Sequence, residues 1–146
     1  MEIVTKTFGE LDVHTLYELL RLRTQVFVVE QDCVYQDLDG KDDRALHVLG
    51  IKNGELVAYT RIFQPGLYFK EAAIGRVVVQ GTQRKHGYGK VIMKASIAAI
   101  EERFKERAIK ISAQTHLKKF YQELGFEQVG EGYLEDGIPH IGMLRS

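Results

Sequence analysis

The chain has 146 residues, 45% of them apolar, with 20 basic and 20 acidic residues. This length fits one domain spanning residues 1–146, with enough apolar material for a hydrophobic core. A net charge of zero argues against a protein that binds nucleic acid or a membrane surface, because such proteins are usually strongly basic. Cys33 is the only cysteine, and no signal peptide or membrane-spanning run is evident, so we expect a cytoplasmic protein without disulfides.

The N-terminal half alternates short apolar runs with polar turns, which predicts strands around one helical stretch. Apolar residues spaced near 3.6 over residues 14–31 predict one or two helices, and the polar run 36–44 is typical of a surface loop. Asn53-Gly54 favours a two-residue hairpin turn, because both positions accept a positive φ. The expected strands lie at residues 2–8, 46–52, 55–63 and 73–80.

The C-terminal half predicts helices and strands in alternation. An apolar stripe over residues 90–107 predicts a helix, and Thr115 is placed to cap a second helix that Gly125 would end. Strands that first form a hairpin and then alternate with helices predict an α/β or α+β fold with a mixed sheet. The remaining strands are expected at residues 109–113, 127–134 and 140–144.

The segment between the strand 73–80 and the helix 90–107 is rich in glycine and positive charge. A helix N-terminus offers unpaired N–H groups, and glycines let a phosphate approach them closely. Gly87 and Gly89 are placed for that role, although a polar loop whose glycines only turn the chain is the alternative. The same anion would be attracted by the side chains of Arg84, Lys85, His86 and Lys90.

Two common phosphate-binding motifs do not fit this segment. A P-loop needs four residues between its glycines, whereas five separate Gly81 from Gly87, and Lys90 is not followed by serine or threonine. A dinucleotide fingerprint needs a third glycine where Ile92 stands. The sequence therefore favours neither a nucleoside triphosphatase nor a dehydrogenase.

The remaining pattern is R-x-x-G-x-G over residues 84–89, after a buried strand and before a helix. It resembles the pyrophosphate-binding motif of the GNAT superfamily of acetyl-CoA-dependent N-acetyltransferases. A second GNAT motif is matched by Phe120, Tyr121, Gly125 and Phe126, with Gln114 and Leu117 in place of the family's asparagine and alanine. Residues 23–42 and 133–143 are similar to the ElaA-like branch of that superfamily.

The resemblance implies the GNAT fold, of class α/β (α+β): a mixed, mostly antiparallel central sheet with a splayed parallel strand pair, flanked by about four helices. It implies acetyl-CoA as cosubstrate and acetyl transfer to a primary amine of a small molecule or peptide, by a monomer or homodimer. A CoA-binding regulatory domain is the alternative, favoured by Gln114. We expect no metal, because the histidines lack metal-ligand spacing and residues 37–43 do not fit an EF-hand loop.

The resemblance also assigns roles to residues by position. Tyr121 would protonate the departing CoA thiolate, unless it only packs in the core. Backbone N–H groups of Val77, Val78 and Val79 would bind the pantetheine arm and the thioester oxygen. The other residues expected to contact the cofactor are Arg84, Lys85, His86, Gly87, Tyr88, Gly89, Lys90 and Gln114.

The acceptor amine needs a base, because amines are mostly protonated at neutral pH. Glu30 and His140 are candidates, and a histidine titrates in the useful range, although His140 at the start of a strand is equally consistent with a surface residue. Arg76 would face the acceptor cleft and bind an anionic group, or else be a surface arginine. Cys33 has no base beside it in sequence and is expected to be structural.

Overall fold

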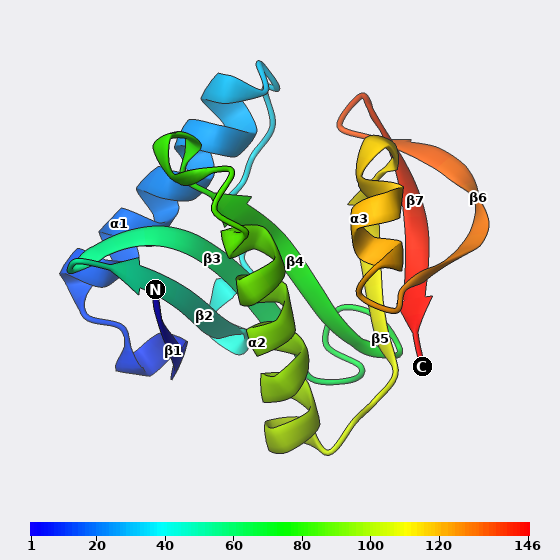
Figure 1. Ribbon diagram of the computed structural model, residues 1–146, viewed down its shortest axis with the longest axis horizontal. Helices are drawn as coiled ribbons and strands as arrows, with labels where there is room; N and C mark the ends of the chain where they lie inside the picture. Colours follow the sequence, from blue (N-terminus) through cyan, green and yellow to red (C-terminus); the bar gives the residue numbers. More distant parts are fainter.

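A computed structural model describes all residues from Met1 to Ser146, in which one seven-stranded sheet runs through the molecule (Figure 1). The strand order is β1-β2-β3-β4-β5-β7-β6, and every neighbouring pair is antiparallel except β4 and β5. The strands are β1 (Glu2–Thr7), β2 (Leu46–Lys52), β3 (Glu55–Phe63), β4 (Ala72–Val79), β5 (Ile109–Gln114), β6 (Glu127–Glu135) and β7 (Ile138–Arg145).

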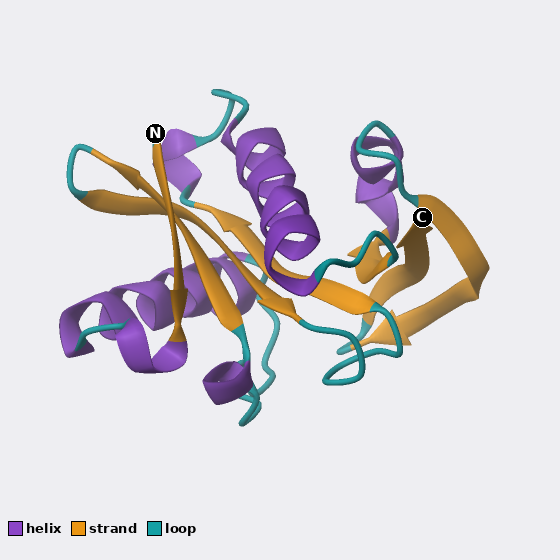
Figure 2. Cartoon of the chain, turned by 90° about the horizontal axis from the view of Figure 1, so that it is seen from below, coloured by secondary structure: helices purple, strands orange, loops and turns teal.

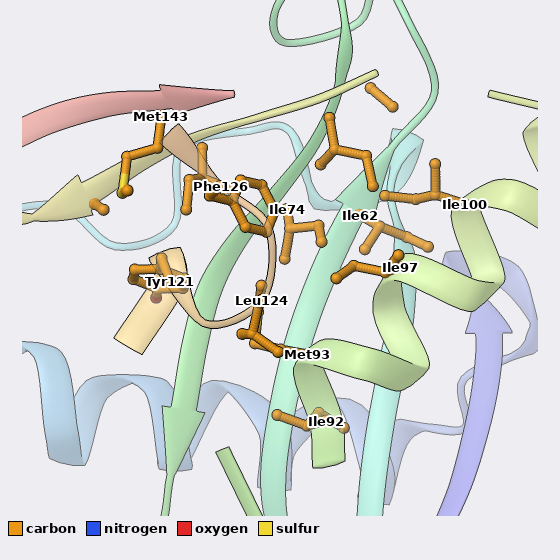
Figure 3. Close-up of a cluster of buried hydrophobic side chains, with 14 of the residues drawn as sticks. Ile62, Ile74, Ile92, Met93, Ile97, Ile100, Tyr121, Leu124, Phe126 and Met143 are labelled. Carbon is orange, nitrogen blue, oxygen red and sulfur yellow. The ribbon is translucent and has the colours of Figure 1, made fainter. Parts of the chain in front are cut away.

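The helices cover both faces of the sheet. They are α1 (Val13–Thr24), α2 (Tyr88–Phe104) and α3 (Lys118–Gln122). In Figure 2 α1 lies on one side of the sheet and α2 on the other. The face under α2 and α3 holds the larger core, where Ile97 and Ile100 point toward Ile62 of β3 (Figure 3). None of the helices is long and apolar enough to cross a lipid bilayer.

The first helix changes its winding partway along. Asp12 caps α1, its side chain accepting a hydrogen bond of 2.7 Å from the Thr15 N–H, an interaction typically worth about 1 kcal/mol. The chain then continues as a π-helical segment, η2 (Gln25–Glu30), instead of ending. Such segments occur mostly as short insertions and often at functional sites. The apolar spacing predicted the helix but not this change of winding.

The parallel pair of strands separates almost at once. β4 and β5 pair only where Ala72 meets Ile109 and Ala73 meets Lys110. Beyond that point β4 carries a bulge at Arg76, whose φ of +50° is unusual for a side chain of this size. A bulge bends its strand, so the rest of β4 has a free edge facing the gap toward β5. The expected mixed sheet with a splayed parallel pair is therefore confirmed.

Two expected helix boundaries differ from the structure. α2 begins at Tyr88 and ends at Phe104, because Lys105 takes the left-handed conformation with φ +54°. The predicted cap at Thr115 is wrong: residues Thr115–Leu117 form a separate 3-10 turn before the short α3. Gly125, at φ +94°, follows that helix as expected.

Candidate active site

The open edge of β4 forms one wall of a cleft with a volume of about 870 Å³. Its other walls come from the N-terminus of α2, from β5, α3 and β7, and from η2. Of the site residues expected from the sequence, Glu30 and His86 do not line this cleft. Those that line it are Arg76, Val77, Val78, Val79, Arg84, Lys85, Gly87, Tyr88, Gly89, Lys90, Gln114, Tyr121 and His140.

The loop before α2 presents free hydrogen-bond donors to the cleft. None of the backbone N–H groups from Arg84 to Lys90 donates a hydrogen bond within the protein. Lys85 and Gly87 have φ values of +71° and +76°, a left-handed geometry that turns successive N–H groups toward a common point. A Cβ added to Gly87 would meet no atom within 4 Å. The loop therefore has both the donors and the open space that a diphosphate needs.

The free edge of β4 also carries donors. Gln80 N–H bonds to the carbonyl of Val57 in β3 at 2.8 Å, and N–H directions alternate along a strand. The N–H groups of Val77 and Val79 therefore point away from β3, into the gap toward β5. By the same alternation the Val78 N–H points toward β3, where Val78 pairs with Tyr59, and the Val78 side chain packs in the core under α1. This arrangement suits an extended chain of amides lying along β4.

The Arg84 side chain lines the cleft but is turned back onto the protein. Its Nη2 lies 2.7 Å from Glu30 Oε2, and its Nε and Nη2 donate to the Val79 carbonyl at 3.3 and 3.2 Å. Each of the two paired side chains is 42% exposed. The contact joins the end of β4 to the end of η2, and it leaves the Glu30 carboxylate with a cationic partner.

Tyr121 is buried, with 6% of its surface exposed, and belongs to the larger core together with Leu124 and Met143 (Figure 3). Its ring meets those of Phe120 and Phe126 edge-on, at centroid distances of 5.1 and 6.1 Å. Burial raises the pKa of Tyr121 to about 12. Burial is the only cause of this shift and no hydrogen bond contributes to it, so at neutral pH the hydroxyl is a protonated donor without a protein partner.

His140 lies on β7 at the opposite wall and is 7% exposed. Its Nδ1 is 2.7 Å from the Ile138 carbonyl oxygen, and its Nε2 is 3.4 Å from Glu135 Oε2. Gln114 is its neighbour in the sheet, and the Gln114 amide donates to Gln31 Oε1 at 3.4 Å. The amide that stands in place of the family's asparagine is thus already in contact with the segment that follows η2.

The Arg76 guanidinium faces the cleft but has protein partners. Its Nε lies 2.8 Å from Asp37 Oδ1, and its Nη2 donates to the Asp37 carbonyl at 2.9 Å. The guanidinium also lies over the ring of Tyr35, 5.6 Å from its centre. These contacts fix the loop of residues 32–41 against β4. An anionic group of the acceptor would have to compete with Asp37 for Arg76.

Two residues beside His140 did not stand out in the sequence. Ser112 lines the cleft on β5, and Tyr133 on β6 stacks on the His140 ring with 6.2 Å between centroids. Glu135, the last residue of β6, also lines the cleft. Ser112 could have been found from the two-residue period of a strand, because this period puts it on the same face as Gln114.

Both the sequence and the fold of this chain match those of known proteins. A family model described as an acetyltransferase (GNAT) domain matches residues 6–146. Escherichia coli ElaA is 46% identical over 139 residues, which cover 94% of this chain and 91% of ElaA. The crystal structure of ElaA matches with a TM-score of 0.91 at 44% identity, covering 99% of each chain.

A second solved structure is even nearer in shape. An acyl-CoA N-acyltransferase from Pseudomonas aeruginosa matches with a TM-score of 0.94 at 40% identity, over 100% of both chains. No group of His, Cys, Asp and Glu side chains in the structure is arranged to hold a metal ion. The agreement in sequence and shape spans nearly the whole chain, which therefore belongs to the GNAT acetyltransferase family, in its ElaA-like branch.

Proposed function

We propose that this chain transfers an acetyl group from acetyl-CoA directly to a primary amine of a small molecule or peptide. The observation that carries the proposal is the row of unpartnered N–H groups from Arg84 to Lys90, beside the free edge of β4. Bound there, acetyl-CoA would supply a thioester that a neutral amine attacks without an acyl-enzyme intermediate. The open space in front of Gly87 supports the fit of a diphosphate.

In such a transfer, different residues of the cleft have different roles. The loop from Lys85 to Lys90 holds the diphosphate through its backbone and the N-terminus of α2. The N–H groups of Val77 and Val79 orient the pantetheine arm, and a preorganised N–H near the thioester oxygen stabilises developing negative charge by about 2.7–4 kcal/mol. Tyr121 donates a proton to the departing sulfur, and His140 removes a proton from the acceptor.

Glu30 is the weaker candidate for the base. Its carboxylate contacts Arg84 at 2.7 Å and lies outside the set of residues that line the cleft. A base must come within hydrogen-bond reach of the proton that it removes. His140 lines the cleft, and no N–H or O–H of the protein donates to its Nε2. We therefore assign the base to His140.

Two measurements, made one after the other, test the proposed function. Calorimetric titration with CoA measures binding, and release of free thiol from acetyl-CoA measures turnover with a panel of amines, polyamines, aminosugars and lysine peptides. We expect micromolar binding and turnover with at least one amine class. Absence of CoA binding would overturn the proposal. Binding without turnover across the panel would favour a regulatory CoA-binding domain.

A further inference from the structure

His140 and Glu135 face each other on one wall of the cleft, and when the imidazole is neutral no hydrogen atom lies between them. Nδ1 of His140 is 2.7 Å from the Ile138 carbonyl oxygen, and a carbonyl only accepts, so Nδ1 carries the hydrogen. In a neutral imidazole Nε2 is then an acceptor. The charged atom nearest to Nε2 is Glu135 Oε2 at 3.4 Å, which is also an acceptor. Two facing acceptors require a donor between them.

Ser112 and Tyr133 hold the side chains of Glu135 and His140 in this arrangement. The second carboxylate oxygen of Glu135 accepts a hydrogen bond of 3.1 Å from Ser112 Oγ. Ser112 Oγ is in turn 2.5 Å from the hydroxyl of Tyr133, whose ring stacks on the imidazole at an interplanar angle of 21°. A side chain fixed by such contacts keeps its geometry before a ligand arrives.

The charge balance at this wall favours a cation. Glu135 and Asp136 line the cleft here, and the one ion-pair contact of Glu135 is with His140. The arginines on the facing wall are already neutralised: Arg61 by Asp39 and Arg76 by Asp37. An ammonium group therefore finds uncompensated negative charge at Glu135 and Asp136.

We propose that His140 Nε2 and Glu135 Oε2 together bind the ammonium group of the acceptor, with Ser112 and Tyr133 as positioning residues. This deepens the proposed function and rests on it for the identity of the reacting amine. One N–H of the ammonium bonds to Nε2 and a second to Oε2, which supplies the missing donor. An ammonium between two acceptors satisfies both, whereas an alcohol has one O–H and satisfies only one.

The same geometry accounts for every proton of the transfer. The ammonium gives its first proton to His140 Nε2, and the nitrogen lone pair then forms the C–N bond as the C–S bond breaks. The second nitrogen proton replaces the one that Tyr121 gives to sulfur, and the third remains on the amide product. The proton on His140 passes to water beside Glu135, whose side chain is 46% exposed.

The test reads the imidazole directly and needs no acetyl-CoA. Protein labelled with ¹⁵N-histidine is titrated at pH 8 with propylammonium chloride to 100 mM, with sodium chloride and 1-propanol as matched probes; His140→Gln assigns the signal. We expect the Nδ1–H tautomer and a saturable shift of Nε2 with propylammonium alone. Glu135→Gln should abolish that shift. Glu131→Gln, which removes an exposed carboxylate from the same strand, should retain it.

The possible outcomes distinguish failure of the ammonium site from failure of the proposed function. An Nε2–H tautomer, an imidazole charged at pH 8, equal responses to propylammonium and propanol, no response, or an unchanged shift in Glu135→Gln would each overturn the site. Ser112→Ala gives a second check, because it frees Glu135 without removing a charge and should weaken the response several-fold. Failure here leaves CoA binding and turnover untouched. A protein that binds propylammonium but not CoA would overturn the proposed function instead.

Discussion

Arg84 and Glu30 form an ion pair of 2.7 Å that joins the loop before α2 to the π-helical end of the first helix. The same guanidinium donates to the Val79 carbonyl at the end of β4. Arg84 therefore connects two walls of the cleft. One is β4, where the cofactor is expected to lie, and the other is η2, which lines the cleft through Phe27. Its contacts support the loop, and we expect Glu30 to act as a positioning residue through Arg84.

Glu30→Gln tests that role against catalysis. A half-exposed ion pair is worth about 0.2–1 kcal/mol, so we expect kcat/KM to fall by no more than about fivefold, with an unchanged pH–rate profile. Loss of a general base would cost about 100-fold or more and would alter the profile. Glu18→Gln, which breaks an exposed pair with Arg21 on the same helix, is the control. A loss of the larger size would make Glu30 the base.

Gly87→Val tests the phosphate site. The added side chain would project into the open space in front of the loop, so we expect the Kd for CoA to rise at least tenfold in calorimetry. A left-handed φ also costs a residue with a Cβ about 1–2 kcal/mol of stability. Gly130→Val is the matched control, because Gly130 has the same φ of +76° and open surroundings on β6. Normal CoA binding by Gly87→Val would show that the site is assigned wrongly.

The elements that local sequence encodes were predicted well. The Asn53-Gly54 turn, the valine run of β4 and the amphipathic α2 each follow from spacing or from a φ requirement within a few residues. The two motifs that brought Gly87 and Tyr121 to notice are equally local. Both lie in the cleft, because a glycine-rich loop before a helix and an apolar helical face determine their own geometry.

The contacts between distant segments could not be predicted in this way. Arg76 meets Asp37 across 39 positions of sequence, and Cys33 Sγ meets the Asp136 carbonyl across 103. Arg76 could be placed on its strand, but no periodicity reveals that a loop carboxylate reaches it. The same holds for Glu135: the run Glu135-Asp136-Gly137 is typical of a solvated turn, whereas in the structure Glu135 faces His140.

Tyr121→Phe tests the proton donor. The variant keeps the ring that packs between Phe120 and Phe126, so CoA affinity and thermal stability should change little. Because burial raises the pKa of Tyr121 to about 12, the hydroxyl remains protonated across the usual assay range. We expect the single-turnover rate to fall about 100-fold or more, as for loss of a general acid. Tyr17→Phe, which alters an exposed tyrosine, is the control and should leave the rate unchanged. An unchanged rate in Tyr121→Phe would show that Tyr121 only packs in the core.

A buried charge network lies beside the cleft, which one of its members, Arg61, lines. Arg23 and Arg61 are almost fully buried and share Asp42 between them at 2.7 and 3.0 Å. His47, also fully buried, has its Nε2 2.9 Å from the Asp42 carbonyl and its Nδ1 2.6 Å from the Tyr59 hydroxyl. Since the carbonyl only accepts, Nε2 carries the hydrogen and Nδ1 accepts from Tyr59, which satisfies a neutral imidazole completely.

This network makes stability depend on pH in two stages. Burial lowers the pKa of His47, so as pH falls below about 6.5 the unfolded chain takes up a proton before the folded one, and stability is lost. Burial alone would raise the pKa of Asp39 and Asp42, but hydrogen bonds and charge from Arg61 and Arg23 outweigh it and lower both values. Their contribution is therefore complete above about pH 4 and is lost only below it.

Urea unfolding between pH 8 and pH 4.5 isolates the first stage. The free energy of unfolding should be level above about pH 7 and then fall, by at most about 1.4 kcal/mol per pH unit for one proton. The amide of His47→Gln keeps both a donor and an acceptor but does not titrate. The free energy of unfolding of this variant should be lower than that of the parent and should depend much less on pH. His14→Gln, at an exposed position of α1, should keep the parent's slope. If His47→Gln keeps it as well, the imidazole is not the group that makes the fold sensitive to acid in this range.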